Sequence, residues 1–416
     1  MSRLRKLVDR FKPHFEKGGR FGIFRSTFDA FETFLFVPNK VTTKGAHIRD
    51  AHDTKRMMSM VVLALMPALL FGFYNTGLQH YRAFGVTEAT ALDWTGIWMC
   101  LKFGFLKILP VIVVSYGVGL AIEFVSAQLR GHEVNEGFLV TGMLIPMILP
   151  PNVPLWIVAL ATAFGVIFGK EIFGGTGMNI FNPALLARAF VFFSYTSYMS
   201  GDRANVAGLM RADGVDGFSG ATPLTSIADG MVEGSPTLDF NGTGVWDWIV
   251  GTHPGALGET SMIAIMMGAA ILLVTGVASW RIMLSVFVGG LGMGLIFNLL
   301  FMLTGSNIYM AMPAYYHLLL GGFAFGAVFM ATDPVTAAQT DTGKWIYGLA
   351  IGVMAVLIRV VNPGYPEGIM LAILFMNAMA PLVDHYVVEA NVRRRRRRLI
   401  AANMAAGATN IKHAGR

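Results

Sequence analysis

The stretch MSMVVLALMPALLFGF, residues Met58–Phe73, contains no charged side chain. Its length approaches the roughly 20 apolar residues that a helix needs to cross the hydrocarbon core of a bilayer. The whole chain shares this character, because 54% of its 416 residues are hydrophobic and only 14% are charged. Soluble domains carry about a quarter charged residues. We therefore predict an all-α polytopic membrane protein.

Similar apolar runs lie on both sides of a polar interval near the middle of the chain. The predicted spans cover residues 58–73, 108–127, 138–151, 155–168, 180–193, 262–278, 282–303, 318–331, 345–361 and 369–383. Their number, about ten, follows from the length of each run. The third is short and ends in Pro150 and Pro151, and a stretch at 98–106 that suits the membrane interface precedes the second.

The charges predict how these spans are oriented. Basic residues gather in the N-terminal segment and in the run Arg393–Arg398, so both ends are expected to face the cytoplasm and anionic lipid headgroups. Five spans before the polar interval place that interval on the opposite side. The predicted organisation is a cytoplasmic segment at 1–56, a first membrane half at 57–199, an extracytoplasmic loop at 200–260, a second membrane half at 261–385 and a basic cytoplasmic tail at 386–416.

The composition argues against several other classes of protein. The net charge of +7 does not predict a nucleic-acid partner, because the positive charge is concentrated beside apolar helices. The single cysteine, Cys100, leaves no disulfide framework or cysteine-ligated cluster within this chain. The first 56 residues lack the short apolar core of a secretory signal. No G-x-G-x-x-G fingerprint follows a predicted strand, so NADH is not expected to bind here.

The two halves share a weak internal repeat. Its features are a Gly-Phe pair that opens an apolar run, a proline that ends the run, a Trp-Ile pair and an Asn-Pro pair. They occur at Gly137-Phe138, Pro150, Trp156-Ile157 and Asn182-Pro183, and again at Gly322-Phe323, Pro334, Trp345-Ile346 and Asn362-Pro363. The halves would then form two inverted five-helix repeats, which in transporters place a binding site near the bilayer midplane. The alternative is that membrane helices share these residue types by composition alone.

The polar stretch DGFSGATPLTS, residues Asp216–Ser226, is glycine-rich and dense in hydroxyl groups. One interpretation is a flexible extracytoplasmic loop. Thr222 is not expected to be a catalytic nucleophile, because its hydroxyl would need a base and the sequence places no histidine close to it. It could instead accept a covalent group, since small neighbours leave the hydroxyl open to a modifying enzyme. Asp216 would then hold a cation or orient the loop.

A second polar stretch, FGGTGMNIFNPA at Phe173–Ala184, precedes the fifth predicted span. Its glycines and the start of the following helix could form a polar pocket of backbone amides that faces a cavity in the membrane. The alternative is a tight turn in which Asn179 and Asn182 serve as helix caps. The residues themselves favour neither interpretation.

Three acids lie at or near the predicted depth of the membrane. Glu123 falls within the second span, Asp333 closes the eighth and Asp384 closes the tenth. Ionisable residues inside a bilayer are costly and usually face a cavity or a partner, so these acids are candidates for an ion pathway. The alternatives are that Glu123 pairs with Arg130 near the cytoplasmic interface, and that the two aspartates only end their helices in the headgroup region.

Several longer motifs make the chain resemble a known family. Asp216–Thr222 matches the pattern Asp-x-x-Ser/Thr-Gly-Ala-Thr, in which a flavin transferase attaches FMN through its phosphate to the last threonine. Further matching motifs are HFEKGG at His14, GHEVNEGF at Gly131, KEIFGGTGMNIFNPA at Lys170, GGFAFGAVFMATDPV at Gly321, RVVNPGYPEG at Arg359 and LVDHYVVE at Leu382. Along nearly its whole length the chain resembles the B-subunit family of the bacterial Na+-translocating NADH:quinone oxidoreductases (Na+-NQR). The D subunit of the Rnf complex carries a similar flavin motif but lacks most of the long N-terminal segment present here.

The resemblance implies a subunit of a Na+-pumping NADH:ubiquinone oxidoreductase in a bacterial inner membrane, with the Thr222 loop in the periplasm. It implies covalent FMN on Thr222, installed by a flavin transferase, and a non-covalent riboflavin. The residues implied for FMN are Asp216, Ser219, Gly220, Ala221 and Thr222, and those for riboflavin are Asn179 and Asn182. Amides suit the donors and acceptors of a neutral isoalloxazine edge. Electrons from NADH would arrive through the other subunits of a six-subunit complex.

For sodium, the resemblance implies a pathway with acids at Asp29, Glu123, Asp333 and Asp384, and Asp29 stands where relatives carry a glutamate. For ubiquinone, it implies a pocket near the cytoplasmic side that Gly119 and Glu123 line and the N-terminal segment helps to form. The alternative for Gly119 is close helix packing. A rival from another class is a secondary transporter without a redox role, in which the SGAT sequence is an ordinary loop.

Overall fold

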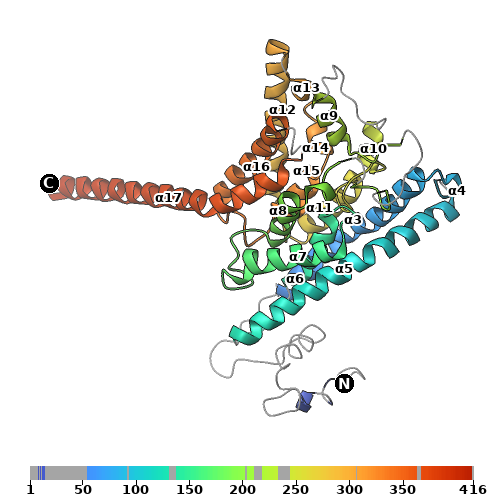
Figure 1. Cartoon of the computed structure of the whole chain (residues 1–416). Helices are drawn as coiled ribbons and strands as arrows, with labels where there is room; N and C mark the ends of the chain where they lie inside the picture. The colour runs from blue at the N-terminus through green and yellow to red at the C-terminus, as the bar shows by residue number, and fades with distance from the viewer. Residues whose placement is uncertain are drawn as a thin grey trace.

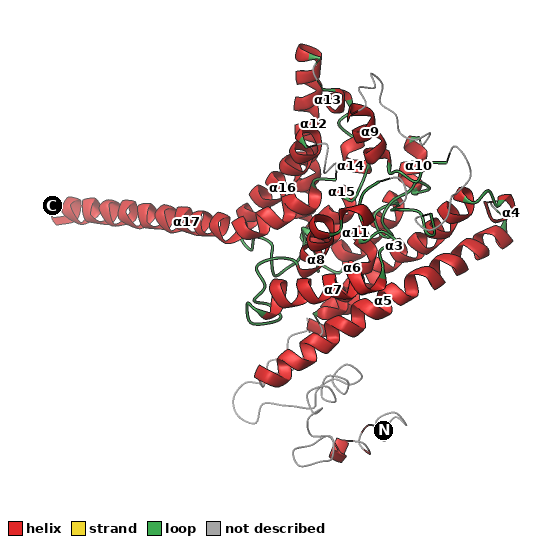
Figure 2. Cartoon of the chain, viewed as in Figure 1, coloured by secondary structure: helices red, strands yellow, loops and turns green. Residues whose placement is uncertain are grey.

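The fold was obtained as a computed structural model of the chain. The structure describes residues 54–90, 93–130, 137–201, 204–209, 218–232, 244–305, 307–362 and 367–414, together with positions 8, 10 and 12–14. Within these ranges the chain is helical and contains no β-strand (Figure 2). The prediction of an all-α protein is confirmed.

Long, medium and short helices follow one another along the chain (Figure 1). The long helices are α3 (Thr54–Ala83), α5 (Trp94–Arg130), α12 (Trp280–Thr304), α16 (Asp341–Val361) and α17 (Ile369–Ala414). The medium helices are α6 (Phe138–Ile148), α7 (Leu155–Val166), α8 (Pro183–Ser194), α9 (Pro223–Val232) and α11 (Met262–Val274). The short ones are α4 (Thr87–Thr90), α10 (Val245–Val250), α13 (Ile308–Ala311), α14 (Tyr316–Leu319) and α15 (Phe323–Phe325), with the π-helical turns η2 (Ile167–Glu171) and η4 (Gly326–Met330) and the 3-10 turn η3 (Thr196–Tyr198).

The five long helices are apolar enough to cross a membrane. Among the described residues these segments are Met57–Ala83, Trp94–Arg130, Trp280–Thr304, Asp341–Val361 and Ile369–Asn403. Three shorter apolar helices, α6, α8 and α11, accompany them. Many large apolar side chains on these helices remain exposed, as expected for surfaces that face lipid. The polytopic character is therefore confirmed, and the count of about ten spans stays a prediction.

The stretch at 98–106 is continuous with the predicted second span, and its interfacial position stays a prediction. Helix α5 runs without interruption from Trp94 to Arg130 and includes both this stretch and the predicted second span. Pro110 lies inside the helix but does not break it. Prolines are tolerated in membrane helices, because neighbouring groups can satisfy the backbone carbonyl that the proline leaves free.

The eighth predicted span, 318–331, is wrong as a single helix. The chain forms α14, breaks at Gly321 and Gly322, and resumes as α15 and η4. Gly321 has φ +66°, a left-handed conformation that glycine adopts readily. Arg359 of α16 donates hydrogen bonds to the carbonyls of His317 (2.8 Å) and Leu320 (3.1 Å), which the break leaves without helical partners. A buried guanidinium from another segment thus makes the interruption possible at membrane depth.

The tenth predicted span also extends much further than expected. Helix α17 begins at Ile369 and continues for 46 residues to Ala414, so most of the basic tail is helical. Figure 1 shows α17 projecting away from the body of the molecule. Arginine and alanine are good helix formers, so the sequence beyond the apolar run has little reason to stop the helix.

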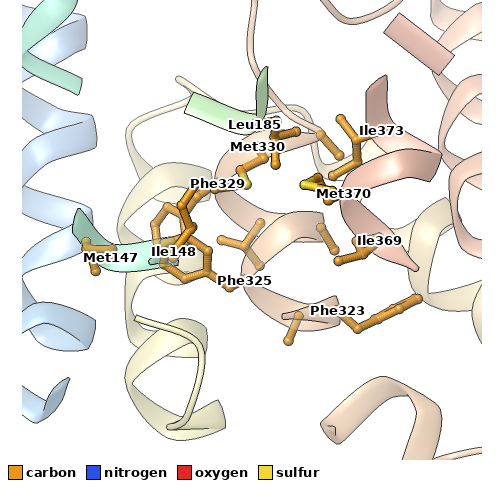
Figure 3. Packing of buried hydrophobic residues seen from close by; sticks show 14 of the residues in the cluster. Met147, Ile148, Leu185, Phe323, Phe325, Phe329, Met330, Ile369, Met370 and Ile373 are labelled. Atoms are coloured by element: carbon orange, nitrogen blue, oxygen red, sulfur yellow. The ribbon is translucent and has the colours of Figure 1, made fainter. Parts of the chain in front are cut away.

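The interrupted helices of the two halves meet in a common apolar core. Figure 3 shows Met147 and Ile148 of α6 beside Phe325 and Phe329. The amide of Gly258 donates a hydrogen bond of 2.8 Å to the Met147 carbonyl and ties the tip of α6 to the turn before α11. The packing pairs α5–α7, α7–α8 and α6–α8 have counterparts in α12–α16, α16–α17 and η4–α17. This correspondence favours an internal repeat, and the inverted orientation of the halves stays a prediction.

Candidate functional site

A cavity of about 120 Å³ lies between the two halves of the molecule. Its walls come from α3, α6, η2, α11 and η4 and from the turns that precede α8 and follow η4. The lining residues are Met57, Met58, Val61, Gly137, Val140, Thr141, Leu144, Lys170, Thr176, Asn179, Asn182, Pro183, Leu272, Val277, Ala278, Phe329, Thr332, Asp333, Pro334 and Val335. The structure therefore brings three predicted site residues, Asn179, Asn182 and Asp333, to one cavity.

Asn182 serves as a helix cap and also lines the cavity. Its Oδ1 accepts hydrogen bonds from the amides of Ala184 (3.0 Å) and Leu185 (3.3 Å), and Pro183 occupies the first position of α8. Its Nδ2 lies 3.5 Å from Oδ2 of Asp333. The helix-cap and pocket interpretations of this asparagine are therefore compatible, because Oδ1 caps α8 while Nδ2 points toward Asp333 at the cavity.

Asn179 lies in the turn between η2 and α8. The turn needs glycine, because Gly174, Gly175 and Gly177 have φ values of 120°, 98° and 91°. The Nδ2 group of Asn179 donates to the carbonyl of Phe181 at 3.3 Å. The side chain thus stabilises the turn locally while the residue contributes to the cavity wall.

Asp333 ends the interrupted helix on the far side of the same cavity. Its oxygens accept hydrogen bonds from the Val335 amide at 3.2 Å and from Oγ1 of Thr336 at 3.1 Å. These contacts fix the orientation of the Asp333 carboxylate just after η4, and Asp333 also lines the cavity.

Glu123 forms a buried ion pair with Lys170, not with Arg130. The side chains of Lys170 and Glu123 are 6% and 5% exposed. Arg130 instead lies 3.9 Å from a carboxylate oxygen of Glu171 and donates to the backbone carbonyl of that residue at 2.6 Å. The alternative pairing of Glu123 with Arg130 is therefore wrong. Lys170 belongs to the π-helical turn η2, and the residue both pairs with Glu123 of α5 and lines the cavity.

Sequence reasoning missed the role of Lys170, although this residue begins one of the matched motifs. The available signal was a lysine next to a long apolar run, where a basic group needs an acidic partner. The pairing itself depends on the contact of α5 with η2, which no local pattern predicts.

Asp384 lies apart from the cavity and holds the start of α16. Its carboxylate accepts hydrogen bonds from the amides of Gln339 (2.7 Å) and Thr340 (3.0 Å) and from the Thr340 hydroxyl (2.6 Å). Gly343 leaves room for this contact, because a Cβ atom there would lie 2.5 Å from Oδ1 of Asp384. The structure does not bring Asp384 together with Glu123 or Asp333, and Asp29 lies outside the described residues.

Gly119 is a close-packing position on α5. An added Cβ atom would lie 1.8 Å from Cζ of Phe138, the first residue of α6. This contact supports the helix-packing interpretation of the glycine. The predicted quinone pocket near Gly119 and Glu123 stays a prediction.

Thr222 caps the N-terminus of α9. Its Oγ1 accepts a hydrogen bond from the Thr225 amide at 3.2 Å and lies 2.8 Å from Oγ1 of Thr225. The Ser219 hydroxyl accepts from the Ala221 amide at 3.3 Å, while Gly220 and Ala221 are buried. Thr222 itself is partly exposed. Asp216, which opens the motif, lies outside the described residues.

Helix α9 rests on the second half of the molecule. The Tyr309 hydroxyl donates a 2.7 Å hydrogen bond to the carbonyl of Leu224, and a Cβ atom at Gly321 would lie 2.7 Å from Cδ1 of Leu224. Beneath this contact, Arg188 of α8 forms ion pairs with Glu259 and Glu367. The Cβ position at Gly321 is also 3.9 Å from Cγ of Glu367, so these ion pairs lie close to the Leu224 contact, and the sequence reasoning also missed them.

The fold and these sites define a polytopic all-helical membrane protein with polar residues gathered between its helices. The chain belongs to the NQR2, RnfD, RnfE family, whose model matches residues 41–393. The resemblance seen in the sequence motifs is thereby confirmed at the level of the family.

Individual relatives resemble the chain over nearly its whole length. It is 48% identical over 408 residues to the B subunit of the Na(+)-translocating NADH-quinone reductase of Pseudomonas aeruginosa, and the match covers 94% of this chain and 98% of that protein. The protein of the same name from Chromohalobacter salexigens is 48% identical over 410 residues, 95% of this chain and 96% of that protein. The one from Azotobacter vinelandii is 47% identical over 408 residues, 94% of this chain and 98% of that protein.

Proposed function

We propose that the chain is the membrane-embedded B subunit of a bacterial Na+-translocating NADH:ubiquinone oxidoreductase. The observation that carries the proposal is the cavity in which Asn179, Asn182 and Asp333 meet, in a chain that matches named B subunits over 94% of its length. The near-complete coverage of those relatives favours this assignment over the D subunit of the Rnf complex. The other subunits would deliver electrons from NADH.

Covalent FMN on Thr222 is the first part of this proposal. A phosphoester at this hydroxyl would place negative charge at the N-terminus of α9, where the helix dipole and the free backbone amides favour an anion. The partial exposure of Thr222 would let a flavin transferase reach it, while buried Gly220 and Ala221 hold the approach to the helix. Asp216 and Ser219 would complete the attachment motif.

Riboflavin in the cavity is the second part. The amides of Asn179 and Asn182 provide donors and acceptors, while Val61, Leu144 and Phe329 provide apolar walls, and this mixture suits a flat ring with a polar edge. The flavin would supply the one- and two-electron chemistry that no side chain offers. The chain's own residues would hold the ring, exclude water from it and set the charge around it.

The sodium pathway and the quinone pocket complete the proposal. Among the described residues no three His, Cys, Asp or Glu side chains gather closely enough to hold a metal ion. We therefore place Glu123, Asp333 and Asp384 at separate positions along a Na+ pathway, with Asp29 in the N-terminal segment. Ubiquinone would bind near Gly119 and Glu123. With FMN in the periplasmic loop and quinone near the cytoplasm, electrons would cross the inner membrane within this subunit.

Flavin fluorescence of the denatured chain tests the proposal directly. The assembled complex is made in a host that supplies the flavin transferase, and the chain is separated in SDS. We expect a fluorescent wild-type band and a dark band for Thr222→Ala. Thr225→Ala is the matched control, because it removes the neighbouring hydroxyl and should leave the band fluorescent.

A secondary transporter without a redox role is the competing interpretation. It predicts a dark wild-type band and no change in any electron-transfer rate when Thr222 is replaced. A fluorescent wild-type band that disappears with Thr222→Ala is incompatible with an SGAT loop that carries nothing.

A further inference from the structure

The cavity and the buried ion pair meet at one side chain. Lys170 lines the cavity together with Asn179 and Asn182, and its ammonium group pairs with the Glu123 carboxylate of α5. Lys170 is the only basic residue among the described residues that line the cavity, and Asp333 is the only acidic one. A single positive charge is therefore shared between the ion pair and the cavity.

Burial makes this arrangement sensitive to any new charge. Residues Lys170 and Glu123 are each 4% exposed, so water screens their interaction only weakly. In such an environment a buried charge needs a partner, and removing that partner is costly. A negative charge that appears in the cavity would therefore compete with Glu123 for the same ammonium group.

We propose that Lys170 is a positioning residue that links the charge of the flavin in the cavity to the availability of Glu123 for a cation. The inference rests on the proposed function, because it needs a flavin in this cavity. While the flavin is neutral, Lys170 pairs with Glu123. When an electron arrives from the other subunits, the Lys170 ammonium group interacts more strongly with the flavin edge and more weakly with Glu123. A Na+ ion can then bind beside the Glu123 carboxylate.

The charges balance in each direction of this exchange. Lys170 and Glu123 keep their protonation states throughout, and the electron from NADH is matched by the Na+ ion at Glu123. When the electron leaves for the quinone, Lys170 returns to Glu123 and displaces the ion. Arg130 cannot substitute for Lys170, because it pairs with Glu171, is 40% exposed and does not line the cavity.

A redox titration of the non-covalent flavin in the whole complex tests this inference. The Thr222→Ala background removes the covalent flavin of this chain from the signal. We expect Lys170→Met to shift the equilibrium toward the oxidised flavin about tenfold, or about 59 mV for a one-electron couple. Lys170→Arg should restore most of the shift, and Arg130→Gln should leave the potential unchanged.

Replacing Lys170 and replacing Glu123 should shift the flavin potential in opposite directions, which a purely structural role of the ion pair would not do. Glu123→Gln should raise the potential, because Lys170 is then left to the flavin. The same change in the Lys170→Met background should have a smaller effect, and the difference measures the coupling between the residues.

The outcomes separate this inference from the proposed function. A wild-type complex without non-covalent flavin overturns the proposed function itself. Bound flavin with an unchanged potential in both single variants overturns only the role of Lys170. If Lys170→Met loses its flavin, Glu123→Gln still carries the test, and an unchanged potential in that variant is the contradicting result.

Discussion

Gly119 and Gly117 lie two positions apart on α5 but have very different surroundings. A Cβ atom at Gly119 would lie 1.8 Å from the Phe138 ring, whereas one at Gly117 would have no atom within 4 Å. The first glycine is therefore required by the packing of α5 on α6, and the second is not. Gly117 is therefore a matched control for substitutions at Gly119.

We expect Gly119→Ala to lower the free energy of unfolding by about 1–3 kcal/mol, because the added methyl group overpacks a rigid aromatic contact. Gly117→Ala should be neutral or slightly stabilising, since alanine favours helix more than glycine does. Thermal unfolding of the purified complex in detergent measures both. Equal effects at the two positions would contradict the packing argument. A loss of quinone affinity in Gly119→Ala beyond its loss of stability would support the predicted quinone pocket.

Local patterns identified residues whose partners are close in sequence. Asn182 was predicted as a cap, and it caps α8 because its partners follow it directly along the chain. Lys170 and the acceptor of its ion pair are 47 positions apart, so no local spacing indicates their contact. Asp384 was predicted to end its own helix, but it caps a different helix through Thr340. Sequence reasoning thus singled out residues that the structure brings to the cavity, and it missed the pairings that tertiary packing creates.

The break between α14 and α15 shows the same limit for whole elements. The apolar run at 318–331 satisfies the composition of a span, and its two glycines alone do not forbid a helix. The break becomes stable only when Arg359 supplies donors to the freed carbonyls and α9 packs against Gly321. By contrast, the predicted run 282–303 nearly coincides with α12, while α3 and α5 extend well beyond the predicted runs 58–73 and 108–127.

We expect Gly321→Ala to destabilise the protein more than Gly305→Ala does. The two glycines have φ values of +66° and +63°, so each substitution carries a backbone cost of about 1–2 kcal/mol. Only at Gly321 would the new methyl group also meet Leu224, at 2.7 Å, while nothing lies within 4 Å at Gly305. Thermal unfolding of the two variants gives the difference.

The same pair of variants connects the break to α9, the helix that follows the proposed flavin site at Thr222. Because Gly321 contacts α9, its substitution should also reduce the yield of flavin on Thr222, read from fluorescence of the denatured band. Gly305→Ala should keep a normal yield. Identical yields would show that the contact with Leu224 does not position Thr222.

At the scale of the whole molecule, Arg188 joins the two halves. It belongs to α8 and pairs with Glu259 before α11 and with Glu367 before α17. The side chains of Arg188 and Glu259 are 4% and 5% exposed, and that of Glu367 is 25% exposed. Removing one member of such a cluster leaves charges buried without compensation.

We expect Arg188→Leu to cost about 3–5 kcal/mol of stability, because Glu259 and Glu367 would face each other without a cation. Adding Glu259→Gln and Glu367→Gln should recover a large part of that loss. Arg281→Leu is the control, since its pair with Asp341 is solvent-exposed and contributes no more than about 1 kcal/mol. Thermal unfolding of the four proteins decides the matter, and a small effect of Arg188→Leu would show that the halves are held by apolar packing alone.

The unbroken course of α17 fixes a distance and a direction. At 1.5 Å per residue, the first arginine of the run 393–398 stands about 14 Å along the axis from Asp384. Six successive residues wind more than once around a helix, so the exposed guanidinium groups point to every side. Rotation of the helix about its axis therefore leaves positive charge facing every direction. Only a change in the number of residues before the run would move the charge relative to Asp384. The last helix thus holds a ring of exposed positive charge at a fixed distance from Asp384.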